Sequence, residues 1–171
     1  MGARVRGLAE IGVQPSIVCG ASIGAVVGAV FATGALDSFE RWGRGLDRSS
    51  LVSLVDLSFR GGVMGGRKPF EVLAKMLGER AIEELPVRFG AVATDLATGQ
   101  EVWLRSGSLL DALRASTALP GLIAPQRLGD RWLVDGGLVN PVPASLCRAM
   151  GATSVVAVDL NTGLIGRRFR G

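Results

Sequence analysis

A glycine-serine turn between an apolar strand and an apolar helix is the feature that most constrains this chain. The turn reads Gly20-Ala21-Ser22-Ile23-Gly24. Residues 16–19 before it are mostly apolar and β-branched, which is typical of a buried strand. Residues 25–33 after it are small and mainly apolar, which predicts a helix that stops at Gly34. This order of strand, turn and helix is the context in which a hydrolase can carry a serine nucleophile.

Each position of the turn has a predicted role. Ser22 is expected to adopt a strained backbone conformation at the end of the strand and to act as a nucleophile. Gly20 and Gly24 leave room for the close approach of strand and helix. The N–H of Ile23 is expected to donate a hydrogen bond to an oxyanion at the start of the helix. A Gly-rich turn with an ordinary serine shows the same pattern, so that alternative stays open.

The chain contains no histidine, which excludes a Ser-His-Asp triad and requires another base beside Ser22. Asp135 is the preferred candidate because it follows the short predicted strand 131–134 and precedes Gly136 and Gly137. The two glycines are expected to let the backbone pack closely around the carboxylate. An ordinary Asp-Gly hairpin turn is the alternative interpretation.

Two other aspartates compete for the role of base. Asp95 and Asp159 each follow an apolar stretch that predicts a strand. We expect each to cap a neighbouring turn or helix, as an aspartate at a strand end often does.

An uncharged segment over residues 14–36 supports a rival interpretation. It is long enough to span a bilayer, and Gly20, Gly24 and Gly28 form a small-residue stripe suited to helix association. Pro15 and the glycine-serine turn interrupt it, and its apolar residues are mainly Ala and Val. We expect a strand, the sharp turn at Ser22 (the nucleophile elbow) and a helix over this segment, and keep a membrane anchor as the alternative.

Composition indicates a single domain over residues 1–171. The chain is 48% apolar, has no low-complexity tract or repeat, and is long enough to bury a sizeable core. Lys and Arg total 19 against 15 Asp and Glu, but the positive charges are scattered, which is typical of a solvated surface. Aromatic residues do not alternate with the basic ones, so nucleic acid is not an expected partner.

The cysteine and histidine content bears on metals and compartment. Cys19 and Cys147 are far apart in the sequence and histidine is absent, so neither a zinc site nor a disulfide framework is expected. Two unclustered cysteines are typical of a reducing compartment, which predicts a cytoplasmic location.

Alternating signals predict an α/β fold. Besides the strand before Ser22, strands are expected over residues 87–94, 101–105, 131–134 and 154–159. Helices are expected over residues 70–77, over 109–118 with Ser108 as N-cap, and over 143–151. The alternation predicts a mainly parallel sheet with helices on both faces. The Gly-rich basic segment 61–68 is expected to form a surface loop, with a lid as the alternative.

Several stretches together resemble the patatin-like phospholipase family, in particular its bacterial subgroup. Besides the Gly-x-Ser-x-Gly turn, they are residues 92–99, 112–121, 132–143 and 151–159. The resemblance covers roughly residues 8–161, and the joint match is far more specific than either short motif alone.

The resemblance implies a three-layer α/β domain and a lipid acyl hydrolase with a Ser-Asp dyad. Carried onto this chain, Ser22 is the nucleophile, Asp135 the base and Ile23 the source of an oxyanion N–H. The implied reaction cleaves a phospholipid, lysophospholipid or related lipid ester through an acyl-enzyme, without a metal or organic cofactor. A lipid substrate also implies peripheral contact with a membrane.

The N-terminal residues depart from the family pattern. The family begins with a strand and a Gly-rich loop that ends in Arg-Gly, and the N–H groups of that loop complete the oxyanion hole. Residues 2–7 resemble the loop superficially, but residues 6–15 favour the helix that follows it, with Gly12 as its C-terminal stop. The chain is therefore expected to be N-terminally truncated. A non-catalytic protein that binds lipid or a protein partner is the alternative function.

Overall fold

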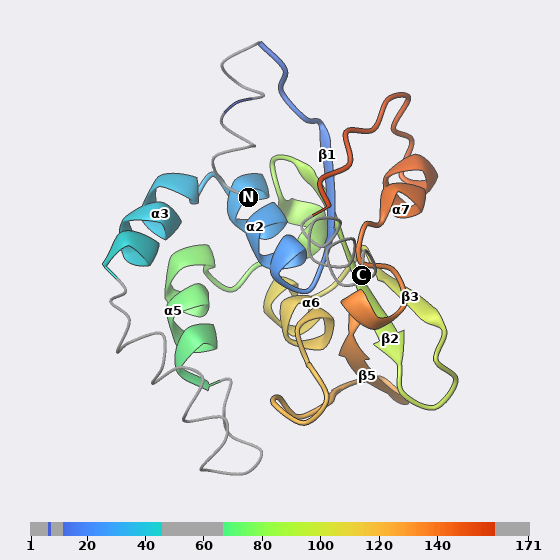
Figure 1. The fold of residues 1–171 in the computed structure, drawn as a ribbon. Coiled ribbons are helices and arrows are strands. Elements are labelled where there is room, and N and C mark those ends of the chain that lie inside the picture. The colour runs from blue at the N-terminus through green and yellow to red at the C-terminus, as the bar shows by residue number, and fades with distance from the viewer. Residues whose placement is uncertain (1–6, 8–11, 46–66, 160–171) are drawn as a thin grey trace, which may run out of the picture.

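A mixed five-stranded sheet lies at the centre of the structure, a computed structural model in which residues 7, 12–45 and 67–159 are described (Figure 1). Among the described strands, β1 and β2 alone pair in parallel; the β2–β3, β2–β5 and β4–β5 pairs are antiparallel. The strands are β1 (Ile17–Ala21), β2 (Arg88–Asp95), β3 (Glu101–Leu104), β4 (Gln126–Leu128) and β5 (Arg131–Asp135).

The α/β class is confirmed, but the prediction of a mainly parallel sheet was wrong. Residues 96–100 join β2 to β3, and Gly129 and Asp130 join β4 to β5. Such short connections can join only antiparallel neighbours, because a parallel pair needs a crossover of a dozen or more residues. The predicted helices are present, but the β2–β3 and β4–β5 hairpins lie between them in the chain. Each hairpin makes its two strands antiparallel.

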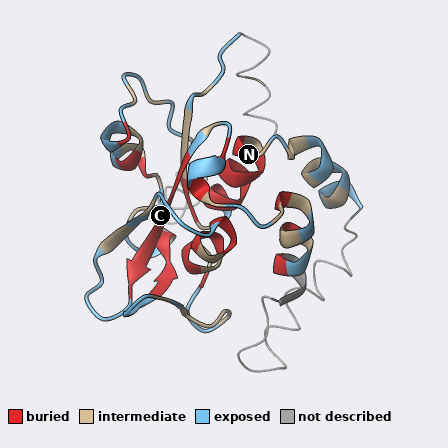
Figure 2. Ribbon diagram, turned by 180° about the vertical axis from the view of Figure 1, so that it is seen from behind, coloured by how far each residue is buried: buried red, intermediate tan, exposed pale blue. Residues whose placement is uncertain are grey.

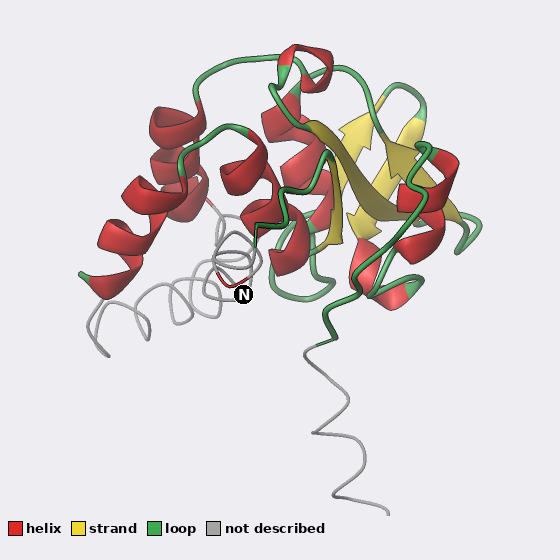
Figure 3. Cartoon of the chain, turned by 90° about the horizontal axis from the view of Figure 1, so that it is seen from above, coloured by secondary structure: helices red, strands yellow, loops and turns green. Residues whose placement is uncertain are grey.

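Helices pack on both faces of the sheet (Figure 3). On one face, helices α2, α5 and α6 bury their apolar sides against Phe89 and Ala91 of β2. On the other face, α7 packs Leu146 and Met150 against Val92. The helices are α2 (Ile23–Ala32), α3 (Leu36–Arg44), α5 (Arg67–Leu77), α6 (Leu109–Ser116) and α7 (Ala144–Ala149), with 3-10 turns η1 (Ile82–Glu84) and η2 (Gly136–Leu138).

Burial follows this layering. The buried residues concentrate in the strands and in α2 and α6, whereas α3 has no buried residue (Figure 2). The expected helices over 70–77, 109–118 and 143–151 are confirmed as α5, α6 and α7, with small shifts of their ends. The N-cap of α6 is also confirmed, because the Ser108 hydroxyl accepts the N–H of Asp111 at 3.2 Å.

The rival interpretation of residues 14–36 as a membrane anchor was wrong. These residues form β1, the turn at Ser22, and α2, which has ten residues. Among the helices in the described ranges, none combines the length and the apolar character needed to cross a membrane. Of the expected loop 61–68, residues 67 and 68 begin α5, and the rest lies outside the described residues. So do residues 6 and 8–11 of the expected N-terminal helix, and residues 13–15 form no helix.

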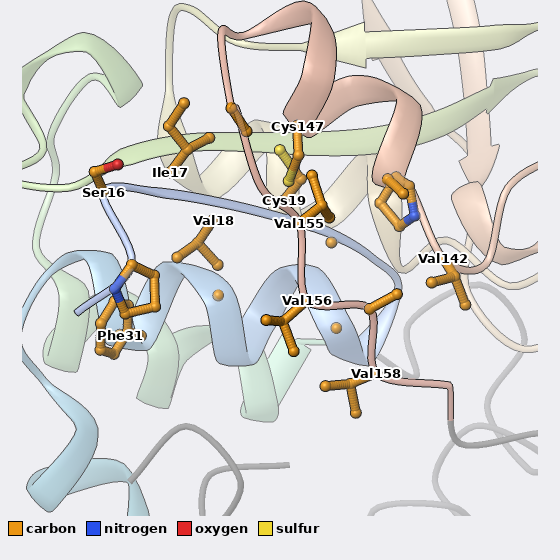
Figure 4. A pocket seen from close by; sticks show the side chains of 18 of the residues that line it. Ser16, Ile17, Val18, Cys19, Phe31, Val142, Cys147, Val155, Val156 and Val158 are labelled. Carbon is orange, nitrogen blue, oxygen red and sulfur yellow. The ribbon is translucent and has the colours of Figure 1, made fainter. Parts of the chain in front are cut away.

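The expected strand over residues 154–159 was also wrong. These residues form no strand, although their β-branched composition favours one. Within the described ranges β1 pairs only with β2, and beyond its other edge lies a cavity of about 400 Å³. Val155, Val156 and Val158 line the opposite wall of this cavity (Figure 4). Strand propensity produces a strand only where a neighbouring backbone lies close enough to pair, and here the cavity separates the two backbones.

The register of β2 determines where the site forms. β1 pairs with residues 88–92 of β2 and ends with Ala21 opposite Val92. β5 pairs with residues 93–95 and ends with Asp135 opposite Ala93. β3 pairs with residues 91–94 of β2, which include residues that also pair with β1 and residues that also pair with β5. A residue that pairs with two strands has one on each side. β3 therefore occupies one edge of β2, and β1 and β5 share the opposite edge. The carboxyl ends of β1 and β5 therefore meet head to head beside Val92 and Ala93.

Candidate active site

The turn at Ser22 is a strained elbow at the end of β1. Ser22 has φ 54° and ψ −129°, and among the described residues no other non-glycine residue has a positive φ. Such a conformation costs on the order of 1–3 kcal/mol and persists only where the surrounding structure holds it. A Cβ at Gly20 would lie 2.3 Å from the carbonyl carbon of Gly24. Only glycine at position 20 lets strand and helix cross this closely.

Asp135 lies directly opposite Ser22. The Ser22 hydroxyl donates a hydrogen bond of 2.5 Å to Asp135 Oδ2, across 113 residues of sequence. The second oxygen, Oδ1, accepts the N–H of Gly137 at 2.7 Å. Only 4% of Asp135 is exposed, so the carboxylate is held by these two donors away from bulk water. The structure thus brings together the two side chains singled out from the sequence.

The two glycines after Asp135 are required by close contacts. A Cβ at Gly136 would lie 2.0 Å from the carbonyl oxygen of Val92. A Cβ at Gly137 would lie 2.9 Å from Asp135 Oδ1 and 4.0 Å from Ser22 Cβ. The first glycine lets the chain pass over β2, and the second leaves space beside the carboxylate. The expected close packing of backbone around Asp135 is what the structure shows.

A buried serine that sequence reasoning missed holds the elbow in place. Ser116, at the end of α6, is fully buried. Its hydroxyl accepts the N–H of Ser22 at 3.0 Å and donates to the carbonyl of Val92 at 2.7 Å. One side chain thereby fixes the strained residue to the central strand. The available signal was a polar residue on the apolar face of a helix, in line with Leu109 and Leu113.

The backbone of Asp135 is fixed from two sides. Thr94 donates its hydroxyl hydrogen to the Asp135 carbonyl at 2.8 Å, and the N–H of Asp135 donates to the carbonyl of Ala118 at 3.0 Å. Both Thr94 and Asp135 are buried. These bonds orient the carboxylate before any ligand arrives. Sequence reasoning missed Thr94 as well, because a threonine within a strand is common and its partner lies 41 residues away.

Ile23 is the first residue of α2, so its N–H belongs to the helical turn whose N–H groups lack partners within the helix. The carbonyl of Ser22 accepts the N–H groups of Ala25 and Val26, which closes that first turn. The side chain of Ile23 is 56% exposed. The site therefore has a backbone donor beside the serine and an apolar side chain at its rim.

Asp95, one of the two rival bases, caps a turn, whereas Ser22 pairs with Asp135. Asp95 Oδ1 accepts the N–H groups of Ala97 and Thr98, which caps the turn after β2 as expected. Burial opposes the ionised form of Asp95, but these N–H groups and Arg131 outweigh it and hold its pKa below the usual value.

Across the described ranges, no three side chains of His, Cys, Asp or Glu gather at a point that could hold a metal ion.

Comparison with known proteins finds similarity to patatin-like phospholipases and to NTE family proteins. A family model described as patatin-like phospholipase matches residues 3–148. An uncharacterized NTE family protein of Mycobacterium tuberculosis is 39% identical over 166 residues, which cover 91% of this chain and 46% of that protein. Patatin-like phospholipase domain-containing protein 7 of Mus musculus is 33% identical over 166 residues, 92% of this chain and 12% of that protein. The chain spans less than half the length of these relatives.

Replacing Ser116 by alanine should destabilise the protein by about 1–3 kcal/mol, because the N–H of Ser22 and the carbonyl of Val92 both lose a buried partner. Denaturant unfolding followed by circular dichroism measures the change. Ser106→Ala is the matched control, since Ser106 is exposed, and it should change stability by less than about 0.5 kcal/mol. Equal stability of the two variants would contradict the anchoring role of Ser116.

Gly136→Ala should destabilise the protein by more than about 2 kcal/mol, because the new Cβ would overlap the Val92 carbonyl oxygen. Gly43→Ala in α3 is the control, since a Cβ there meets nothing within 4 Å and alanine favours a helix. Thermal unfolding of the two variants measures the difference. A Gly136→Ala protein as stable as Gly43→Ala would show that the chain does not need glycine at this crossing.

Proposed function

The chain belongs to the patatin-like phospholipase family, and on that premise we propose that it is a serine hydrolase of lipid acyl esters. Members of this family are generally lipid acyl hydrolases. The observation that carries the proposal is the 2.5 Å hydrogen bond from Ser22 Oγ to Asp135 Oδ2 in a chain without histidine. A hydroxyl needs a base to become a nucleophile, and its hydrogen bond to this carboxylate supports Asp135 as that base. The substrate class is a phospholipid, lysophospholipid or related ester.

The first half of the proposed reaction is acylation of Ser22. Its Oγ attacks the ester carbonyl carbon while its proton passes to Asp135 Oδ2. The N–H of Ile23 and the N-terminal end of the α2 dipole stabilise the oxyanion of the tetrahedral intermediate. The carbon–oxygen bond to the leaving alcohol then breaks. That alcohol takes the proton from Asp135, and the fatty acyl group remains on Ser22.

The second half releases the fatty acid. Water attacks the acyl carbon, and Asp135 accepts the proton of that water. The second tetrahedral intermediate collapses, and Ser22 Oγ leaves with the proton returned by Asp135. The Gly137 N–H and the Ser116 and Thr94 bonds keep carboxylate and elbow in one geometry through both halves. The reaction uses no metal or organic cofactor.

Exposed apolar side chains next to the dyad support a lipid substrate. Ile23 follows Ser22 and is 56% exposed, and Leu138 ends the turn after Asp135 and is 58% exposed. Leu119 is 40% exposed and follows Ala118, whose carbonyl accepts the Asp135 N–H. We call these three residues the apolar rim. Apolar groups gathered around a reacting centre favour an acyl chain and contact with a lipid surface. We therefore propose that the protein makes peripheral contact with membranes. We also propose that residues 1–171 form one three-layer patatin-like domain.

A fluorophosphonate probe should label the wild-type protein covalently, because it reacts with an activated serine. Ser22→Ala should abolish labelling, and Asp135→Asn should slow it by about 10² or more, the usual contribution of a general base. In-gel fluorescence measures both. Labelling that survives Ser22→Ala would contradict the nucleophile. A folded wild type that resists labelling would favour the non-catalytic alternative, a protein that binds lipid or a partner.

Leu138→Asp should lower the rate of hydrolysis of phospholipid vesicles by about tenfold or more, because a charge at the rim must be desolvated at the lipid surface. Hydrolysis of a short water-soluble ester should change little. Val13→Asp is the control, since Val13 is 43% exposed and precedes β1, at the end away from Ser22. Equal losses on vesicles and soluble ester, or equal losses in the two variants, would contradict surface contact through the rim.

A further inference from the structure

The two cysteines of the chain lie side by side behind the elbow. Cys19 is on β1, three residues before Ser22, and Cys147 is on α7. Both are free and half-buried, and both line the 400 Å³ cavity. Their sulfur atoms lie next to each other (Figure 4), close enough for each thiol to shift the pKa of the other. The Cys19 thiol also lies 3.6 Å from the Met150 sulfur. The sequence separates these residues widely, and only the packing of α7 on β1 joins them.

The neighbourhood treats the two thiols differently. The neighbouring Cys19 side chain, together with the Cys19 backbone, outweighs burial and lowers the pKa of Cys147 to about 7. The Cys147 side chain, together with burial, raises the pKa of Cys19 above its usual range, and the Arg88 charge opposes this only in part. Cys147 thus has a large thiolate fraction near neutral pH, while Cys19 keeps its proton.

We propose that Cys19 and Cys147 form a redox-active pair that closes into a reversible disulfide when hydrogen peroxide enters the cavity. In the first step the Cys147 thiolate attacks a peroxide oxygen. The O–O bond breaks, Cys147 is oxidised to a sulfenic acid, and the hydroxide that leaves becomes water by taking up the proton that Cys147 released to solvent on ionising. In the second step Cys19 sulfur attacks the Cys147 sulfur, the S–O bond breaks, and the hydroxyl leaves as water with the Cys19 proton. Two thiols and one peroxide give one disulfide and two waters.

The cavity suits a small uncharged oxidant. Its walls near the sulfurs are apolar, with Ile17 on the same face of β1 as Cys19 and Val155 beside the two thiols (Figure 4). Hydrogen peroxide is little larger than water and carries no charge, so it enters such a space without losing strong hydration. The bridge would tie β1, whose last residue precedes Ser22, to α7 on the far face of the sheet. This proposal does not depend on the hydrolase activity.

Thiol mapping of the wild-type protein tests the proposal. Reduced protein is exposed to a small molar excess of hydrogen peroxide, unfolded in N-ethylmaleimide, digested without reductant and examined by mass spectrometry. The expected product is one peptide pair joined through Cys19 and Cys147, which dithiothreitol restores to two thiols. No other intramolecular pair exists, since the chain has two cysteines. Maleimide on both cysteines after peroxide, or disulfides only between chains, would overturn the pair.

Alkylation of the wild type and one variant together assign the attacking sulfur. In the reduced wild type, where each thiol still acts on the other, a trace of iodoacetamide at pH 7 should alkylate Cys147 faster than Cys19, because Cys147 carries the larger thiolate fraction. In Cys19→Ser, Cys147 should form a sulfenic acid that dimedone traps, because the second thiol is gone. Equal alkylation of the two cysteines in the wild type would overturn the assignment of Cys147 as the attacking sulfur. The wild-type measurements do not require the variant to fold.

Discussion

The site exists because two strands end against each other on the same edge of β2. β1 runs toward Val92 from one direction and β5 toward Ala93 from the other, so their last residues become neighbours. Backbone pairing on β2 sets this meeting point to within one residue, and a register shift by one would turn every side chain of β5 to the opposite face. The hydrogen bond between Ser22 and Asp135 follows from this register. Its partners are brought together by strand pairing and need no flexible loop to find each other.

A small network of buried polar groups keeps the ends of β1 and β5 in this arrangement. Ser116 joins the elbow to β2, Thr94 joins β2 to the backbone of Asp135, and Gly137 supports the carboxylate. Within the described residues, no buried side-chain polar atom lacks a partner. Complete pairing matters because an unpaired polar group in this low-dielectric interior would cost about as much as the strain at Ser22. The network offsets the strained conformation of Ser22 and orients its hydroxyl.

β1 links the two chemical features of the protein. Its carboxyl end carries the elbow, and its middle carries Cys19, which faces α7 on the other side of the sheet from α2. The cavity beyond its free edge gives small molecules access to the sulfurs but is not lined by Ser22 or Asp135. The proposed acyl chemistry and the proposed thiol chemistry would therefore take place on the same strand with separate approaches from solvent.

The sequence by itself determined the local features: the elbow around Ser22, the Asp-Gly-Gly turn at Asp135, the main helices, and membership in the family. These depend on glycine, capping and apolar periodicity within a few residues, and such signals are readable from neighbours in the chain. Only the tertiary structure decided that β5 runs antiparallel to β2 and that residues 154–159 form no strand. It also decided that Ser116 anchors the elbow and that Cys19 and Cys147 lie side by side. Each of these is a pairing between distant segments. The free energy of such a pairing depends on which backbone or side chain arrives opposite, and no local pattern contains that partner.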